Sequence, residues 1–251
     1  MEYEILGQLR VSGGPGVRAP QARKVETLLA VLLAKANQAV TTELLVSELW
    51  DGNPPRRATA AVYVYVSDLR KLLRGAGETG PVVTSSHGYS LRVHPGELDA
   101  DRFNTLYEQG RVLYQDRRYG AASEKLRQAC DLWRGSVFGG FIDTPVVSAY
   151  ATYFEELRLG CLELFMEAEL LQGRSREIIG QLFRLTKQHT LREGFYEYLM
   201  TALSRCGRRA EALETFAVAR KQLSEQLGIE PGRALRELQM SILTGDMCDA
   251  V

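Results

Sequence analysis

The segment from Arg57 to Arg74 constrains the fold of this chain most strongly, because its two sides differ in kind. At 100° per residue, a helix over this segment gathers four apolar residues in one narrow arc: Val62, Val66, Leu69 and Leu73. The opposite side is small, polar and cationic and consists of Ala60, Val64, Ser67, Lys71 and Arg74. One side of this helix is therefore predicted to pack on a core, and the other to face solvent or a partner.

Two more helices are predicted ahead of this one. Apolar residues recur at intervals of three and four from Arg23 to Ala36, which is typical of an amphipathic helix. Thr41 or Thr42 is expected to cap a second helix, which the run 51–55 ends.

Extended segments are predicted on both sides of these helices. Runs at 82–86 and 89–93 flank His87-Gly88, a hairpin signal. A short strand at Tyr3–Val11, followed by a turn and an extended piece near Val17 to Pro20, predicts a small N-terminal sheet. Three helices followed by a hairpin is the arrangement of a winged helix-turn-helix.

Beyond Pro95 the pattern changes to helices alone, up to Leu243. Counted from Arg117, Gly173 and Gly207, small or apolar residues recur five, nine and twelve positions further on. The last two origins are 34 residues apart, the period of tetratricopeptide helix pairs, and one extra helix fits around 146–164. We therefore expect a mainly α protein with a winged-helix domain at 1–95 and an all-α, tetratricopeptide-like domain at 96–251.

The net charge of zero hides a difference between these parts. Residues 1–95 hold 11 basic and 8 acidic side chains, whereas 96–251 hold 20 and 23. Overall neutrality argues against a chain that coats nucleic acid along its whole surface. The basic residues at 53–92 are either a polyanion contact or an ordinary solvated surface.

Motifs for other functions are missing from the sequence. There is no GxxxxGK[ST] phosphate loop, GxSxG elbow or HExxH pair, and none of the three histidines has a partner at metal-ligand spacing. The four cysteines are 31, 45 and 42 residues apart, with no CxxC pair. We predict no enzyme activity, cofactor, metal site or membrane span, and a cytoplasmic location.

The whole chain resembles the SARP family, the Streptomyces antibiotic regulatory proteins. Its first part resembles an OmpR-type winged helix at Glu48-Leu49-Trp50, Pro54-Pro55-Arg56, Val66-Ser67-Asp68-Leu69-Arg70-Lys71-Leu72-Leu73 and Gly88-Tyr89. Its second part resembles the bacterial transcriptional activation domain of that family at Asp99-Ala100-Asp101-Arg102-Phe103, Leu132-Trp133-Arg134-Gly135, Glu155-Glu156-Leu157-Arg158-Leu159, Leu191-Arg192-Glu193 and Leu227-Gly228-Ile229-Glu230-Pro231-Gly232.

This resemblance implies a nucleoid-associated activator of a secondary-metabolite gene cluster. Such a protein binds direct repeats in double-stranded promoter DNA, with a second protomer beside the first. It recruits the RNA polymerase holoenzyme, with the sigma and alpha subunits as expected contacts. Two departures from the family pattern stand out: Asp68 occupies a position where relatives commonly carry arginine, and Ser85 and Ser86 replace a basic residue of the wing.

The predicted DNA-binding residues come from the helix and the hairpin, because a helix about 10 to 12 Å across fits the major groove. They are Arg57, Ala60, Val64, Ser67, Asp68, Arg70, Lys71 and Arg74, with Thr84, Ser85 and His87 of the hairpin. Arg57 is assigned to a phosphate, and the later cations to phosphates or guanines.

Several of these assignments have alternatives. Val64 either packs on a thymine methyl or is an ordinary surface residue. Asp68 either accepts a hydrogen bond from a cytosine or pairs with Arg70, Lys71 or Lys24. Tyr63 and Tyr65 either touch phosphates or pack on neighbouring elements. The alternative function is a helical-repeat scaffold whose winged helix does not bind DNA.

Overall fold

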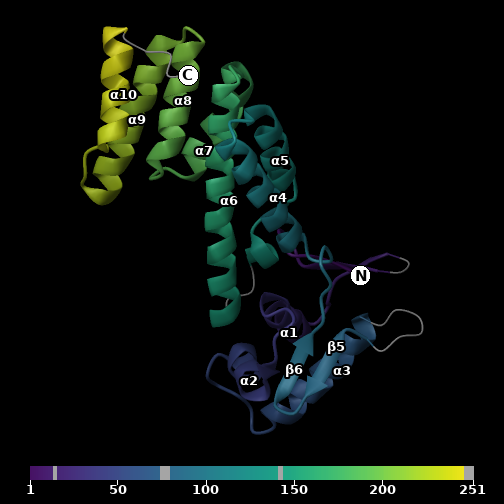
Figure 1. Ribbon diagram of the computed structural model, residues 1–251. Helices are drawn as coiled ribbons and strands as arrows, with labels where there is room; N and C mark the ends of the chain where they lie inside the picture. Colours follow the sequence, from purple (N-terminus) through teal and green to yellow (C-terminus); the bar gives the residue numbers. More distant parts are fainter. Residues whose placement is uncertain (14–15, 74–79, 141–143, 246–251) are drawn as a thin grey trace. The chain divides into compact units, whose positions relative to one another are not determined.

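The computed structural model describes residues 1–13, 16–73, 80–140 and 144–245 (Figure 1). It forms two compact units: Met1–Tyr107 with Gln128–Leu159, called unit 1, and Glu108–Arg127 with Gly160–Val251, called unit 2. Three helices run through both units, namely α4 (Asp99–Gln115), α5 (Tyr119–Asp131) and α6 (Pro145–Leu171). The predicted domain boundary at residue 95 falls inside unit 1. That residues 1–95 form a domain of their own therefore stays a prediction.

The helices of the winged helix are α1 (Arg23–Ala34), α2 (Thr42–Trp50) and α3 (Ala58–Leu73). Thr41 is the N-cap of α2, and its hydroxyl accepts a hydrogen bond from the Leu44 N–H at 3.2 Å. On α3, the four residues predicted to face the core are all at most 1% exposed. The predicted amphipathic division of this helix is therefore confirmed.

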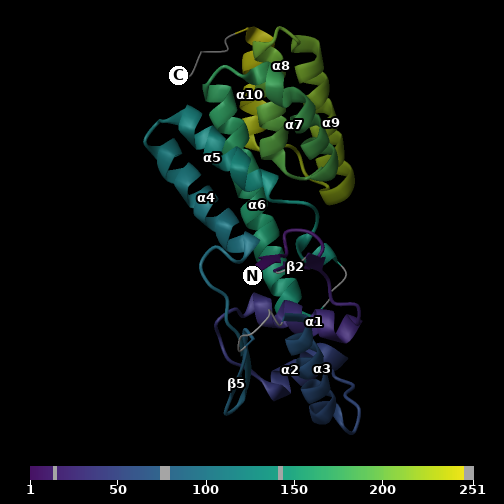
Figure 2. The ribbon, with the colours of Figure 1, turned by 90° about the vertical axis from the view of Figure 1, so that its right-hand side faces the viewer.

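The wing is a three-stranded antiparallel sheet. It consists of β4 (Val40–Thr41), β5 (Val82–Ser85) and β6 (Gly88–Leu91) in the order β4-β6-β5. Figure 2 shows the hairpin of β5 and β6 beside the three helices. Gly88 is required by the approach of β4, since an added Cβ would lie 1.9 Å from the Val40 carbonyl oxygen.

A second antiparallel sheet is formed by β1 (Glu2–Glu4), β2 (Arg10–Ser12) and β3 (Val17–Arg18). The prediction of one strand within Tyr3–Val11 was wrong, because residues 5–9 separate two strands. The Ile5 N–H bonds the Asp99 carboxylate at 2.9 Å, and the Leu6 N–H bonds it at 3.1 Å. The carboxylate of Asp99, at the start of α4, thus accepts hydrogen bonds from N–H groups that would otherwise continue the strand.

Asp99 is a buried carboxylate that ties the N-terminal segment to the helices of unit 1. The guanidinium of Arg134 bonds Asp99 at 2.9 Å and Glu4 at 3.0 Å. Burial raises the pKa of Asp99, and its N–H and guanidinium donors oppose that rise. Backbone bonds from Arg134 to Leu6 and from Phe138 to Ile5 complete the junction.

Unit 2 continues with α7 (Ser175–Gln188), α8 (Glu193–Arg205), α9 (Arg209–Leu227) and α10 (Arg233–Thr244). The predicted repeat positions are all buried: Ala122, Leu126, Ala129, Ile178, Leu182, Leu185, Ala212, Phe216 and Ala219. The extra helix predicted around 146–164 is the 27-residue α6. No helix within the described residues is long and apolar enough to cross a membrane.

Candidate nucleic-acid interface

The side of α3 opposite the core is open to solvent. Ala60, Ser67 and Lys71 are exposed, and Val64 keeps 58% of its surface. Removing an exposed apolar side chain from water is favourable, so Val64 is available for an apolar contact with a partner. The structure thus brings together the helix residues that the sequence singled out.

The cations near α3 differ in their partners. Arg57, directly before the helix, is exposed, and its side chain bonds no described residue. Lys71 pairs with Asp68 at 2.8 Å on the helix surface. Arg74, also predicted to bind DNA, lies outside the described residues.

Arg70 is held by the wing. Its guanidinium donates to the Thr84 hydroxyl at 2.6 Å and to the Val82 carbonyl oxygen at 3.3 Å. It also lies 5.9 Å from the ring centroid of Tyr89. The sequence assigned Arg70, like Lys71 and Arg74, to a phosphate or a guanine, and in the structure Arg70 joins α3 to both strands of the hairpin.

Asp68 and the two tyrosines of α3 have different surroundings. Among its proposed partners, Asp68 pairs with Lys71, while Lys24 donates to the Leu49 carbonyl oxygen and lies over the Trp50 ring. Tyr65 packs against Trp50, with ring centroids 6.1 Å apart. Tyr63 is 56% exposed and lines a hollow beside the wing.

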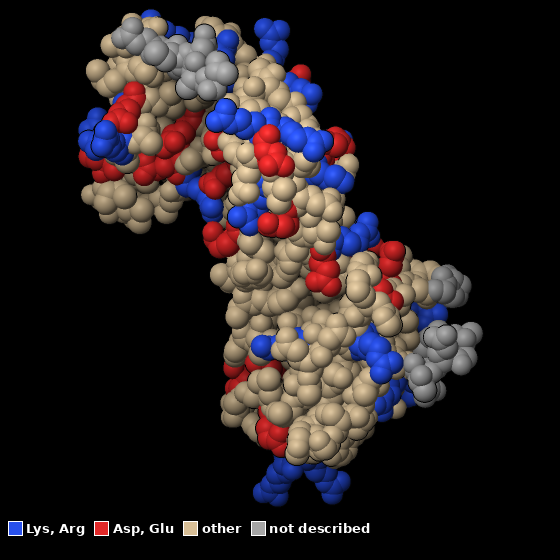
Figure 3. All heavy atoms as spheres, viewed as in Figure 1, with Lys and Arg blue, Asp and Glu red and all other residues tan. Residues whose placement is uncertain are grey.

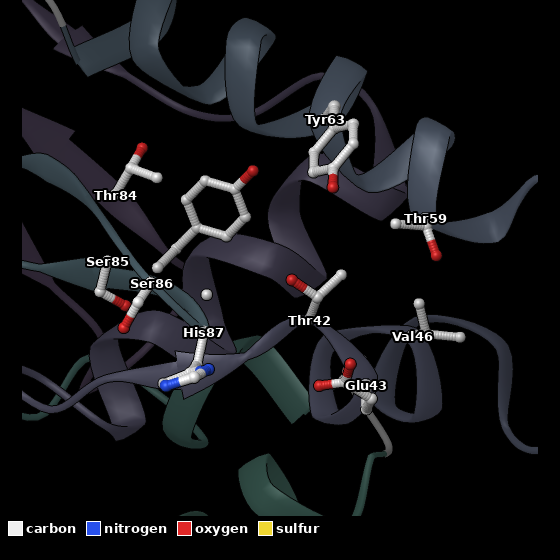
Figure 4. Close-up of a pocket in the computed structure, with 11 residues that line it drawn as sticks. Thr42, Glu43, Val46, Thr59, Tyr63, Thr84, Ser85, Ser86 and His87 are labelled. Carbon is white, nitrogen blue, oxygen red and sulfur yellow. The ribbon is translucent and has the colours of Figure 1, made fainter.

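This hollow has a volume of about 520 Å³ and lies between α2, α3 and the hairpin (Figure 4). Hydroxyl groups from all three elements line it, together with a carboxylate and an imidazole: Thr42, Glu43, Thr59, Tyr63, Thr84, Ser85, Ser86 and His87. The predicted wing residues Thr84, Ser85 and His87 therefore share one surface with α3. Tyr89 also lines the hollow, and burial raises the pKa of its hydroxyl, which stays neutral at physiological pH.

Thr42 and Thr59 are hollow-lining residues that sequence reasoning did not assign to the site. Both stand in the first turn of a helix, and such positions are read from sequence as caps. The Thr42 N–H also bonds the His87 carbonyl oxygen at 3.3 Å, which fixes the start of α2 against the hairpin. Only the folded arrangement shows that these hydroxyls face the same space as the wing.

An exposed polar helix beside a wing, in a chain that continues as tetratricopeptide-like helix pairs, defines the class of two-part transcriptional regulators. Residues 20–91 match the family model of the transcriptional regulatory protein C-terminal domain, and residues 98–243 match that of the bacterial transcriptional activator domain.

Similar proteins support these two family matches. The regulatory protein DnrI of Streptomyces peucetius is 34% identical over 98% of this chain and 93% of its own length. The transcriptional regulator RedD of Streptomyces coelicolor is 36% identical over 98% of this chain and 71% of its own. The structure of Mycobacterium tuberculosis EmbR with a low-affinity phosphopeptide matches with a TM-score of 0.91 and 31% identity, over 99% of this chain and 66% of that one.

The chain belongs to the SARP family of transcriptional activators. This is a family of regulators and not of enzymes, and its members act through DNA and the transcription machinery.

Proposed function

We propose that this protein activates a secondary-metabolite gene cluster by binding direct repeats in its promoter and recruiting RNA polymerase. The observation that carries the proposal is the exposed polar side of α3 standing beside a hydroxyl-lined hollow and a wing. A helix in the major groove with a hairpin on the adjacent backbone uses all three surfaces at once.

The residues of α3 divide by what they can read. Ala60, Val64 and Ser67 are assigned to the base edges, and the exposed Val64 offers an apolar side chain to a thymine methyl. Arg57 is assigned to a phosphate, and Lys71 and Arg74 to phosphates or to the acceptors of guanine. Asp68 restrains Lys71 by their ion pair, which limits how the lysine meets DNA.

The wing and the hollow bind the sugar-phosphate backbone. Thr84, Ser85 and His87 present short polar groups, and the hydroxyls of Thr42 and Thr59 add donors from the starts of α2 and α3. Arg70 acts by orienting the hairpin through Thr84 and Val82. Uncharged donors position DNA with a smaller salt dependence than cations do, because they release no counterions.

Two protomers are proposed to lie side by side on direct repeats, as the family resemblance implies. Neighbours share one face of the duplex when their half-sites are about 10 to 10.5 bp apart. The helical domain would contact the neighbouring protomer and the sigma and alpha subunits of the holoenzyme. Inserting about half a helical turn between repeats should abolish cooperative binding, and cooperativity that survived would contradict this arrangement.

The test of DNA recognition starts with duplexes selected from random sequences by the full-length protein. Gel shifts at several salt concentrations should show that affinity for the selected site exceeds that for unrelated DNA and falls linearly on a log–log scale. Substituting Arg57 or Lys71 should flatten that slope by about one unit each. If no sequence is enriched, the scaffold function becomes the better description.

A further inference from the structure

Three turns of unit 2 share one backbone shape and one residue type. They connect α4 to α5, α6 to α7 and α8 to α9, and a residue with positive φ stands in each: Arg117 at 58°, Gly173 at 75° and Gly207 at 76°. The next residue is arginine every time, and its N–H bonds the carbonyl oxygen five residues earlier at 2.9 to 3.0 Å. Arg118, Arg174 and Arg208 are therefore equivalent residues of three successive helix pairs.

Hydrogen bonds between neighbouring turns place them in a row. The side chain of Gln172 in the second turn bonds the Tyr119 carbonyl oxygen beside the first turn at 3.2 Å. Arg205, just before the third turn, bonds the Leu170 carbonyl oxygen at 2.6 Å, and Arg209 just after it bonds the Leu243 carbonyl oxygen at 2.5 Å. Lys and Arg side chains gather over the end of unit 2 where α5 begins and α6 ends (Figure 3).

We call this row the arginine edge. It comprises seven exposed arginines, Arg117, Arg118, Arg174, Arg176, Arg205, Arg208 and Arg209. Four acidic residues, Asp116, Glu169, Glu177 and Glu211, lie in the same stretches, 113–121, 169–177 and 203–211. Stretches chosen in the same way at the opposite end, 186–195 and 225–235, hold three basic and three acidic side chains. Positive charge is thus concentrated on one edge of the helix pairs.

The arginines of this edge stand where helix stability disfavours them. The three equivalent residues directly precede α5, α7 and α9, at the positive end of each helix dipole, where a cation is repelled. The N-cap arginines of α7 and α9 make no side-chain capping bond, although short polar residues are preferred there. Arg117 has the left-handed conformation that the other two turns give to glycine.

Much of this charge is available to a partner. The side chains of Arg117, Arg118 and Arg176 are exposed and bond no described residue. Arg174 and Arg208, in contrast, pair with Glu169 and Glu211. Three helix N-termini and three free guanidinium groups therefore present positive charge along a line.

We infer that the arginine edge is a docking surface for an acidic protein surface of RNA polymerase holoenzyme. A protein fits better than DNA, because carboxylates interrupt the row and the exposed Leu243 adjoins Arg209. A phosphate backbone carries negative charge alone and has no apolar surface to cover a leucine, whereas a protein can match charges of both signs and bury the leucine. This inference rests on the proposed function, since it names the surface through which polymerase is recruited.

The test uses two substitutions that leave the ion pairs of the edge intact, Arg118→Asp and Arg176→Glu in one full-length protein. The control is Arg233→Asp. Arg233 is also an exposed arginine at a helix start, but it lies at the opposite end of the helix pairs. Acidic residues suit helix N-termini, so the double variant should melt at or above the wild-type temperature. The control gives up only an exposed ion pair with Glu237, so it should melt close to wild type.

Purified RNA polymerase holoenzyme is the probe, captured on a bead-bound duplex that carries the selected site and a core promoter. The double variant should retain holoenzyme about tenfold less well than wild type, and the control should match wild type. Affinity for the bare duplex should be unchanged in both. Unchanged retention by the double variant, or equal loss in the control, would overturn the inference.

The remaining outcomes distinguish a failure of the docking inference from a failure of the proposed function. Weaker binding of the double variant to bare DNA would make the edge a DNA contact and overturn the protein assignment. If wild type binds the duplex but retains no polymerase, the docking inference and recruitment both fail while DNA recognition stands. If wild type does not bind a selected duplex at all, the proposed function fails.

Discussion

The two three-stranded sheets of unit 1 are built alike but anchored in opposite ways. The sheet β1-β2-β3 is tied to the helices by the buried Asp99 and by backbone bonds from the segment 134–138. The sheet β4-β6-β5 is joined to α3 by the guanidinium of Arg70 at the protein surface, and its polar residues line an open hollow. Burial of its polar anchor suits the first sheet for a structural role, while exposure suits the second for contact with DNA.

Truncation after Pro95 would break this comparison most severely. The fragment keeps the wing sheet and α1 to α3, but it loses Asp99 and Arg134, which hold the first sheet. We expect specific DNA binding to weaken but persist, and activation in a purified transcription reaction to be lost, since the helical domain is absent. The fragment should also melt below the full-length protein.

Two results of this truncation would contradict its premises. Full activation by the fragment would exclude the helical domain from recruitment. Complete loss of single-site binding, with the fragment unfolded by circular dichroism, would mean that residues 1–95 do not form a domain on their own.

Asp99→Ala tests the buried anchor within the intact chain. It removes the acceptor of the Ile5 and Leu6 N–H groups and leaves the charge of Arg134 without this partner. Breaking a buried ion pair by removing one member costs about 3 to 5 kcal/mol, measurable as a lower free energy of unfolding in urea.

Asp68→Ala is the matched control, because Asp68 also pairs with a cation but has 46% of its side chain exposed. An exposed pair is worth about 0 to 1 kcal/mol. Equal losses of unfolding free energy in the two variants would refute the distinction between the anchors.

Gly88→Ala tests how tightly the wing sheet is closed. The new Cβ would fall against the Val40 carbonyl oxygen and force β4 away from β6. Overpacking of this kind costs about 1 to 3 kcal/mol of stability. Because the displaced hairpin carries the proposed DNA-binding residues of the wing, DNA affinity should drop too. Gly80→Ala, where nothing lies within 4 Å, should change neither quantity.

The sequence predicts those parts of the fold that depend on local periodicity. The helical spacing of apolar residues along α3 identified its buried and exposed sides, and Thr41 was one of two predicted caps of α2. The break between β1 and β2 was not predictable in this way, because the acceptor that causes it lies 94 residues from Ile5. A contact that pairs distant residues leaves no periodic trace.

The candidate site shows the same limit. Residues that share one helix face were grouped correctly, but Thr42 and Thr59 join the wing only through the tertiary fold. The contact between Arg70 and Thr84 was not predicted, because Thr84 lies 14 residues further along the chain. Helical position alone cannot separate Arg70 from its neighbour Lys71.

Replacing each of these neighbours with alanine gives the smallest and sharpest prediction. Lys71→Ala removes a cation from the exposed side of α3, so the slope of log affinity against log salt should fall by about one unit. Arg70→Ala instead frees the hairpin from α3 and should weaken binding by about 1 kcal/mol, the net value of a typical hydrogen bond, with the slope unchanged. Thr84→Val deletes the hydroxyl that Arg70 bonds and should reproduce part of that loss. Gel shifts on the selected duplex at several salt concentrations measure both quantities together. If Arg70→Ala lowers the slope as Lys71→Ala does, Arg70 contacts a phosphate directly, and the wing is positioned by the packing of its strands rather than by this guanidinium.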